Sequence, residues 1–134
     1  MKFFVTGVNG QLGHDVMNEL NKRGHQGVGS DMADTYAGVE DGSAVTRMDY
    51  VKLDITDKDA VSKVIEAVKP DAVIHCAAWT AVDMAEDDDK VEAVRKVNAG
   101  GTQNIADTCK KLNCKMLYLS TDYVFDGQGT EPWK

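Results

Sequence analysis

The 134-residue sequence contains little cysteine, and the cysteines that it has form no recognisable pattern. Cys76, Cys109 and Cys114 are an odd set without a CxxC pair, and no histidine stands at a ligand-like spacing from them. Small secreted domains depend on even sets of bridged cysteines, and structural zinc sites on closely spaced Cys and His ligands. The sequence therefore predicts neither a disulfide framework nor a metal site, and a reducing, cytoplasmic location is the default expectation.

Long apolar runs are absent as well. The apolar start reaches Thr6-Gly7 within a few residues, which is too soon for a signal-peptide core. No window approaches the roughly 18 consecutive apolar residues of a membrane-spanning helix. We expect a soluble chain without a targeting segment and without a membrane partner.

Positive charge is scarce relative to negative charge. The chain carries 15 Lys and Arg residues against 22 Asp and Glu residues, a formal net charge of −7. Such a field repels phosphate backbones, so nucleic acid is not expected as a partner. Any anionic ligand would have to be held by local backbone geometry instead.

Proline is rare and low-complexity tracts are missing, which excludes disordered and collagen-like chains. With 2 prolines, 43% hydrophobic and 28% charged residues, the composition is that of a globular protein. A chain of this length buries about 65–70% of its unfolded surface, enough for one core. A single domain is predicted.

Hydrophobic spacing alternates along the chain between two kinds of segment. Near-continuous apolar runs predict strands at 3–5, 51–53, 72–74 and 116–119, with a weaker strand at 26–30, and helical spacing marks 12–20, 61–68 and 91–112. Thr56 or Asp57 opens the second helix, and Gly24 ends the first. The segment 32–46 lacks helical spacing, and Tyr36 to Ser43 is predicted to form a surface loop. Alternation of this kind predicts an α/β fold with a parallel sheet of about five strands.

The first predicted strand leads directly into a glycine-rich turn, Thr6-Gly7-Val8-Asn9-Gly10-Gln11-Leu12-Gly13. The first glycine suits a tight turn, the second lets the backbone approach a pyrophosphate, and the third lets helix and strand pack closely. The N-terminus of the following helix would offer free N–H groups to phosphates. The alternative is an ordinary tight turn, but the strand before and the helix after favour a dinucleotide site.

Acidic residues stand at the ends of two further predicted strands. Asp31 is placed to accept hydrogen bonds from an adenosine ribose, which would favour NAD over NADP, because a carboxylate repels a 2′-phosphate. It could also simply begin a turn. Asp54 could accept a hydrogen bond from an adenine amine, or share helix capping with Thr56 and Asp57.

Several other signals favour ordinary structural roles. The acidic run 85–89 suits dipole compensation at a helix start better than a cation site. His14 follows the glycine turn and could approach the phosphates, whereas His75 is predicted to be a strand-end residue with a satisfied ring. Cys76 is predicted to be a small buried hydrophobe.

Together these residues resemble the extended short-chain dehydrogenase/reductase superfamily, and within it the dTDP-4-dehydrorhamnose reductase family. The resemblance spans the whole chain. It rests on the glycine turn and on Asp54-Ile55, His75-Cys76-Ala77-Ala78, Thr80-Ala81-Val82-Asp83, Val97-Asn98 and Ser120-Thr121-Asp122-Tyr123-Val124-Phe125-Asp126-Gly127. It implies a Rossmann-like doubly wound sheet whose C-terminal substrate domain is absent, so that residues 1–134 form an NAD(P)-binding domain incomplete at its C-terminal end.

The resemblance also implies a site and a reaction. NADH or NADPH would be the cofactor, and the reaction would reduce a dTDP-4-keto-6-deoxy sugar, dTDP-4-dehydrorhamnose to dTDP-L-rhamnose. Thr121 would hydrogen-bond the substrate carbonyl oxygen as the catalytic hydroxyl, beside the substrate-binding residues Asp122 and Val82. The implied cofactor-binding residues are Gly7, Asn9, Gly10, Gln11, Leu12, Gly13, Asp31, Asp54, Ile55, Ala77, Ala78, Trp79, Thr80 and Asn98, with Asn98 in a structural or proton-relay role.

One part of the family pattern is missing from the sequence. The superfamily's proton donor is the tyrosine of a YxxxK pair, and Tyr36, Tyr50, Tyr118 and Tyr123 all lack a lysine four residues later. We therefore expect the chain to bind cofactor better than it catalyses. An open final strand predicts homodimerisation or other association through the exposed sheet edge.

Two alternatives to the reductase stay open. A sugar-nucleotide epimerase or dehydratase shares the glycine turn and the Ser/Thr position. A non-catalytic cofactor-binding module, resembling the regulatory subunit of methionine adenosyltransferase, shares the fold.

Overall fold

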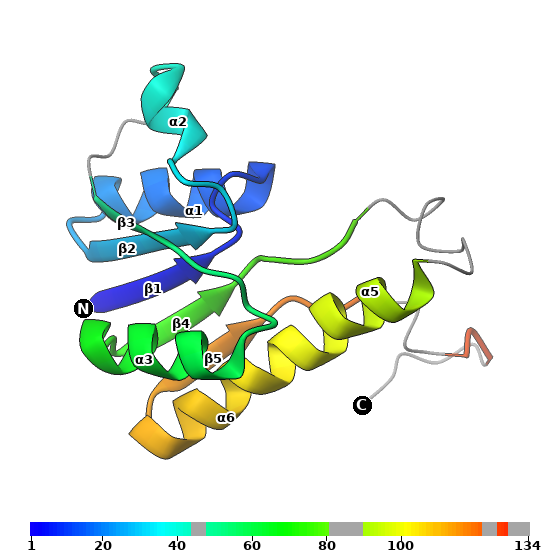
Figure 1. Cartoon of the computed structure of the whole chain (residues 1–134). Helices are drawn as coiled ribbons and strands as arrows, with labels where there is room; N and C mark the ends of the chain where they lie inside the picture. The colour runs from blue at the N-terminus through cyan, green and yellow to red at the C-terminus, as the bar shows by residue number, and fades with distance from the viewer. Residues whose placement is uncertain (44–47, 81–89, 122–125, 129–134) are drawn as a thin grey trace.

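The computed structural model describes residues 1–43, 48–80, 90–121 and 126–128, and its centre is a five-stranded parallel sheet (Figure 1). The strands lie in the order β3-β2-β1-β4-β5. Their bounds are β1 Lys2–Thr6, β2 Gln26–Asp31, β3 Asp49–Lys52, β4 Ala72–His75 and β5 Lys115–Tyr118. The predicted α/β class and parallel sheet are confirmed.

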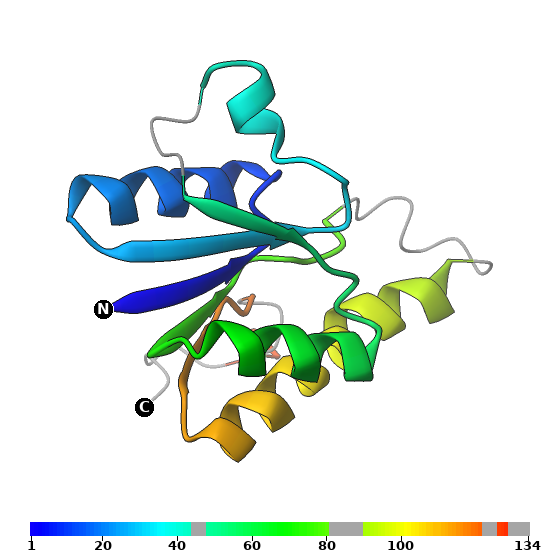
Figure 2. The ribbon, with the colours of Figure 1, turned by 60° about the vertical axis from the view of Figure 1, so that its left-hand side comes forward.

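Helices cover both faces of this sheet (Figures 1 and 2). One face carries α1 (Gln11–Lys22) and the short α2 (Ala37–Glu40), and the other carries α3 (Lys58–Val68) and α6 (Thr102–Leu112). The helix α5 (Val91–Arg95), the π-helix η1 (Lys96–Gly101) and α6 follow one another along a single rod. The predicted long helix over 91–112 is thus present, with a π-helical turn inside it that its spacing did not indicate.

Local sequence signals account for both ends of α3 and for the C-terminal end of α1. The Asp57 side chain caps α3 by accepting a hydrogen bond from the Ala60 N–H at 3.0 Å. Beyond the other end, Lys69 adopts left-handed geometry just before Pro70. Gly24, with φ of +71°, ends the turn after α1, as predicted.

The expectation of a surface loop at 32–46 is wrong in two respects. The described part of this segment contains α2, and Tyr36 is only 4% exposed. The Tyr36 ring stacks on Tyr50, with 6.2 Å between centroids, and its hydroxyl lies 2.7 Å from His14 Nδ1. A single inserted aromatic residue and a four-residue helix leave no periodic pattern, so the spacing could not indicate them.

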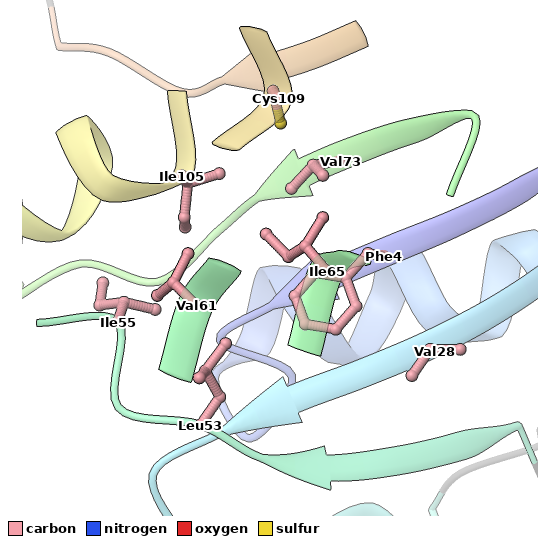
Figure 3. Close-up of a cluster of buried hydrophobic side chains, with 9 residues drawn as sticks. All are labelled: Phe4, Val28, Leu53, Ile55, Val61, Ile65, Val73, Ile105 and Cys109. Atoms are coloured by element: carbon pink, nitrogen blue, oxygen red, sulfur yellow. The ribbon is translucent and has the colours of Figure 1, made fainter. Parts of the chain in front are cut away.

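Two apolar clusters hold the layers together. The larger lies between the sheet and the α3 and α6 helices (Figure 3) and consists of Phe4, Val28, Leu53, Ile55, Val61, Ile65, Val73, Ile105 and Cys109. The smaller lies under α1 and consists of Val5, Val8, Met17, Leu20 and Tyr36. Each fully buried Val, Ile, Leu or Phe side chain contributes roughly 1.5–3 kcal/mol.

The β5 strand is an open edge in the described part of the chain. It pairs with β4 alone, and Leu117 and Leu119 remain 57% and 44% exposed. Paired residues point to the same face, and Leu117 is in register with Ile74, which packs in the cluster under α1. No helix of the described residues therefore covers this side of β4 and β5 as α1 covers the neighbouring strands.

Two rows of side chains run across four of the five strands on the face of α3 and α6, and β3, which places Asp49 and Val51 in these rows, does not follow their pattern. Since neighbours in register share a face, the strand pairings align Val28, Phe4, Val73 and Met116 in one row. Two residues nearer the carboxyl ends, the same pairings align Ser30, Thr6, His75 and Tyr118. An apolar core layer is thus followed by a polar layer directly beneath the carboxyl edge of the sheet.

His75 is the central member of the polar row and is only 1% exposed. Its ring nitrogens both have partners: Nδ1 lies 2.7 Å from Thr6 Oγ1, and Nε2 lies 3.0 Å from Thr102 Oγ1. Burial disfavours the charged ring and lowers the pKa of His75 to about 4. The prediction of a strand-end histidine with a satisfied ring is confirmed.

This burial makes stability depend on pH in a defined window. The pKa of His75 is about 4 in the folded chain against an ordinary value of 6.5, so below pH 6.5 the unfolded chain binds the proton more readily. We expect the contribution of His75 to the free energy of unfolding to be fully present above pH 6.5 and to fall by about 3 kcal/mol between pH 6.5 and 4. Urea unfolding measured at half-unit pH steps tests this.

The carboxylates also titrate near the lower end of this window, so a variant is needed to isolate the histidine. His75→Gln should be less stable at pH 7 but should lose the part of the slope between pH 6.5 and 4 that this residue causes. His25→Gln, outside the polar row, should retain that slope. Parallel pH profiles for the wild type and His75→Gln would contradict the assignment.

Candidate functional site

The strand order places a topological switch point between β1 and β4. The chain proceeds from β1 to β2 on one side and arrives at β4 on the other, so the loops after these strands diverge at the carboxyl edge. In open α/β sheets, ligands bind in the crevice at such a point. A Cβ on Gly7 would lie 2.7 Å from both N and Cα of Ala77, so the two loops are already in close contact there.

The structure favours glycine for a different reason at each of the three glycine positions of the turn after β1. Gly7 has φ of +73°, and its N–H donates to the Ser30 carbonyl at 2.8 Å. Gly13 is buried, and a Cβ there would lie 2.2 Å from the Gly7 carbonyl oxygen, which supports the predicted close packing of helix and strand. Gly10 is exposed in extended geometry, and the nearest atom to its would-be Cβ is the Gly7 oxygen at 3.3 Å. The protein itself therefore demands glycine least at position 10.

The N-terminus of α1 has no side-chain cap and no acidic residue in its first turn. The adjacent side chains of Gln11 and Leu12 are exposed, Leu12 to 46%. By contrast, α3 in the same chain has its N-terminus capped by Asp57 and carries an acidic Asp59 in its first turn. The N–H groups and positive dipole end of α1 are thus available to an anion, next to the glycine turn.

Asp31 and Asn9 join the glycine turn to the segment after β2. The Asp31 carboxylate accepts the Asn9 N–H at 2.9 Å through Oδ2 and the Met32 N–H at 2.8 Å through Oδ1. The Asn9 side chain in turn accepts the Ala37 N–H at 2.8 Å and donates to the Thr35 carbonyl at 3.1 Å. A carboxylate has about four lone-pair positions, so the half-exposed Asp31 keeps acceptor capacity for a ligand hydroxyl.

The segment that begins at Asp31 is acidic, although Lys52 is the in-register neighbour of Asp31 on β3. Residues 31–43 include Asp31, Asp34, Glu40 and Asp41 but no lysine or arginine. Lys52 reaches Asp34, at 2.6 Å between Nζ and Oδ1, and this contact lowers the pKa of Asp34. His14 lies beside Tyr36 and Asn18.

The residues after β3 are divided between surface and core. Asp54 Oδ1 accepts hydrogen bonds from the Thr56 N–H at 2.9 Å and from the Thr56 hydroxyl at 2.8 Å. The side chain that caps α3 is that of Asp57 and not that of Asp54. The Ile55 side chain is buried in the larger apolar cluster, beneath Gly101. A ligand could therefore reach Ile55 only through its backbone.

The segment after β4 is held by Asn98. The Asn98 side chain accepts the Trp79 N–H at 2.7 Å and donates to the Trp79 carbonyl at 3.3 Å. Asn98 lies in the π-helix η1, an irregularity that occurs frequently at functional sites. Ala78 and Thr80 on either side are exposed, and Trp79 Nε1 is buried without a hydrogen-bond partner among the described residues.

The predicted catalytic and substrate residues are only partly described. Thr121 is exposed and follows β5 at the same carboxyl edge as the other loops. Asp122, Val82 and the acidic run 85–89 lie outside the described residues. Sequence reasoning did not single out Thr6 or Thr102 as partners of His75, because a threonine in a strand and one in a helix carry no local sign of pairing.

The described residues form neither a metal-ligand cluster nor a membrane-spanning helix. Across residues 1–43, 48–80, 90–121 and 126–128, no three His, Cys, Asp or Glu side chains gather as metal ligands would. In the same part of the chain, no helix combines the length and apolar composition that a membrane crossing requires.

Comparisons with known proteins agree with this arrangement. A dTDP-4-dehydrorhamnose reductase from Streptomyces griseus is 35% identical over 133 residues, covering 99% of this chain and 37% of that protein. A crystal structure of a dTDP-4-dehydrorhamnose reductase from Bacillus anthracis in complex with NADP has a TM-score of 0.73 and 33% identity, covering 94% of this chain and 38% of the other. The Bordetella bronchiseptica enzyme WbmH in complex with NAD+ has a TM-score of 0.77 and 27% identity, covering 97% and 42%.

The chain thus spans a little over a third of the length of the curated relative that it matches. A family model described as the RmlD substrate binding domain matches residues 1–134. Since this match runs through every element of the fold and every loop of the site, the chain belongs to the RmlD substrate binding domain family.

Proposed function

We propose that this chain binds the dinucleotide cofactor, NADH or NADPH, of a reductase that acts on a dTDP-4-keto-6-deoxy sugar. The observation that carries the proposal is the uncapped N-terminus of α1, which follows the glycine turn at the topological switch point. The names of the relatives support the substrate class, with dTDP-4-dehydrorhamnose as the specific substrate.

The residues present fit a dinucleotide along the whole carboxyl edge. The open N–H groups at Gln11 and Leu12 suit a pyrophosphate, and Gly10, whose own N–H donates to the Gly7 carbonyl at 3.1 Å, leaves room for it by having no side chain. The acceptor capacity left on Asp31 suits a ribose hydroxyl. Asp54 and the Ile55 backbone lie on the side where an adenine would be held. Residues 77–80 would contact the nicotinamide end, and Asn98 holds this segment through its hydrogen bonds to Trp79. Trp79 Nε1, buried without a partner among the described residues, is a donor available there.

When bound, the reduced cofactor supplies a hydride to the keto carbon. This chain contributes orientation: the glycine turn holds the phosphates, and the loop after β4 supports the nicotinamide end. Thr121, at the end of β5, would donate a hydrogen bond to the substrate carbonyl oxygen, where negative charge develops during reduction. Asp122 and Val82 would contact the sugar nucleotide.

Gly10→Val should reduce NADH affinity at least tenfold while leaving the fold intact. Gly10 has extended backbone geometry that any residue adopts, and its nearest protein atom beyond its chain neighbours is 3.3 Å from the would-be Cβ. A valine side chain would instead occupy the space that the phosphates need. The measurement is titration of NADH fluorescence, with circular dichroism as the check on folding.

Two further variants separate ligand binding from folding. Gly13→Ala should destabilise the protein, because its Cβ meets the Gly7 carbonyl oxygen. Gln11→Ala should bind NADH nearly as well as the wild type, because the proposed contact is made by the backbone N–H. Equal NADH affinity in Gly10→Val and the wild type would remove the glycine-turn argument.

We expect a modest preference for NADH over NADPH. The segment 31–43 contains four carboxylates and no lysine or arginine, so a 2′-phosphate would meet like charge at Asp31. Asp31→Asn removes the charge and keeps one of the two oxygens that accept the Asn9 and Met32 N–H groups, and it should narrow the difference between the two dissociation constants. A wild-type preference for NADPH of tenfold, ~1.4 kcal/mol, would show that Asp31 does not select against the 2′-phosphate.

The 134-residue chain tested by itself should bind NADH without measurable ketoreductase activity. A threonine hydroxyl such as that of Thr121 is too weak an acid to protonate the carbonyl oxygen near neutral pH, and the chain contains no YxxxK pair. Loss of a positioned acid alone lowers rates by roughly 10²–10⁴. NADH oxidation with the dTDP-4-keto sugar is the assay, and rapid turnover would place the proton donor among these residues.

A further inference from the structure

The segment that follows β4 is tied to one histidine by two separate routes. On the first route, the Ala77 N–H donates to Thr6 Oγ1 at 3.2 Å, and Thr6 Oγ1 lies 2.7 Å from His75 Nδ1. On the second, His75 Nε2 lies 3.0 Å from Thr102 Oγ1, and Thr102 lies one turn after Asn98. Both routes leave the same ring and return to the backbone within four residues of it.

The direction of each hydrogen bond follows from the groups themselves. Thr102 Oγ1 lies 2.7 Å from the Asn98 carbonyl, which can only accept, so the Thr102 hydrogen points to that carbonyl. Thr102 must therefore accept from His75, and Nε2 carries a hydrogen. Thr6 Oγ1 already accepts from the Ala77 N–H, so its own hydrogen is free to be donated to His75 Nδ1.

The second route ends on Trp79. The Asn98 side chain accepts the Trp79 N–H at 2.7 Å and donates to the Trp79 carbonyl at 3.3 Å. Asn98 therefore binds the Trp79 backbone through its side chain, while its own carbonyl accepts the Thr102 hydroxyl. Thr102 begins α6 immediately after the π-helix that contains Asn98. The ring of His75 is thus connected to Ala77 through β1 and to Trp79 through the helical rod.

We propose that His75 is a positioning residue, whose neutral ring with hydrogen on Nε2 holds the backbone from Ala77 to Trp79 in the geometry of the ligand site. That this backbone supports the nicotinamide end of the cofactor rests on the proposed function. The ring is 1% exposed, and a buried polar group is costly unless every partner is matched.

A protonated ring would not fit this arrangement. Its Nδ1–H would give Thr6 a second donor beside the Ala77 N–H and would leave the Thr6 hydrogen without its acceptor. Among the described residues, the ring contacts come from three elements: Thr6 on β1, Thr102 on α6 and Tyr118, stacked at 5.8 Å, on β5. Behind Thr102 lies the carbonyl of Asn98 on η1. These contacts include no carboxylate that would stabilise a charged ring.

The first experiment measures the tautomer directly. In the full 134-residue chain labelled with ¹⁵N-histidine, we expect NMR at pH 7 to show His75 with a protonated Nε2 and an unprotonated Nδ1. Thr102→Val, which removes the acceptor for Nε2–H, should alter this signature and shift the amide signals of Ala77 and Trp79.

Thr108→Val is the matched control. Thr108 lies on the same helix, is 5% exposed, and likewise donates to a carbonyl four residues earlier, Asn104, at 2.9 Å. Among the described residues Thr108 makes no hydrogen bond to His75, so its variant should lose similar stability without changing the tautomer. Equal effects of Thr102→Val and Thr108→Val on the His75 ring would show a merely structural role and overturn the proposal, as would hydrogen on Nδ1 or a charged ring at pH 7 in the wild type.

The second experiment measures NADH affinity. Thr6→Val and Thr102→Val should each weaken binding about tenfold, the upper range expected for one lost hydrogen bond. Thr6→Ser, which restores the hydroxyl, should recover most of the affinity lost in Thr6→Val, and Thr108→Val should bind NADH as the wild type does. Unchanged affinity in Thr6→Val and Thr102→Val would overturn the link from His75 to the ligand site.

The two readouts separate this inference from the proposed function. Failure of the wild type to bind NADH would contradict the proposed function and, with it, the nicotinamide-side role of the segment. The tautomer and the amide shifts would still decide whether His75 positions Ala77 and Trp79.

Discussion

The close approach of the loop after β1 to both α1 and the loop after β4 is the constraint on which the rest of the structure depends. A Cβ at Gly13 would lie 2.2 Å from the Gly7 carbonyl oxygen, and a Cβ at Gly7 would lie 2.7 Å from Ala77. These distances leave no space for a side chain at either position. Because the loops touch, the N-terminus of α1 opens onto the switch point, where the N–H groups of the helix can face a ligand.

The sheet itself is layered from an apolar interior toward a polar edge. The row of Val28, Phe4, Val73 and Met116 is followed two residues later by Ser30, Thr6, His75 and Tyr118 on the same face. In-register parallel pairing puts residues of one kind side by side across strands far apart in sequence. Hydrogen bonds satisfy His75 and Thr6 at this depth and also order the backbone above them, whereas the buried Ser30 hydroxyl has no hydrogen-bond partner among the described residues.

Coverage of the sheet is uneven, and this bears on how the chain would behave in solution. In the described part of the chain, α3 and α6 cover one face, whereas on the other face α1 covers β1 and β2 and leaves Leu117 on β5, and Leu119 just after it, exposed. An open edge next to exposed leucines favours self-association, which stays a prediction here. Thr121 lies three residues beyond the end of β5.

The sequence by itself determined the alternation of the five strands with the main helices, the glycine turn and the Asp57 cap, because these depend on contacts or periodicities within a few residues. Motifs spread along the whole chain indicated the family. The sequence also placed Asp31, Asp54 and Thr121 at strand ends, and parallel strands bring such ends to one edge. Only the tertiary structure decided that Tyr36 is buried against His14 and Tyr50, that Ile55 faces the core, and that a π-helix aims Asn98 at Trp79. The pairing of His75 with Thr6 and Thr102 joins residues 69 and 27 positions apart. Partners at such separations are selected by strand register and helix packing, which no local pattern encodes.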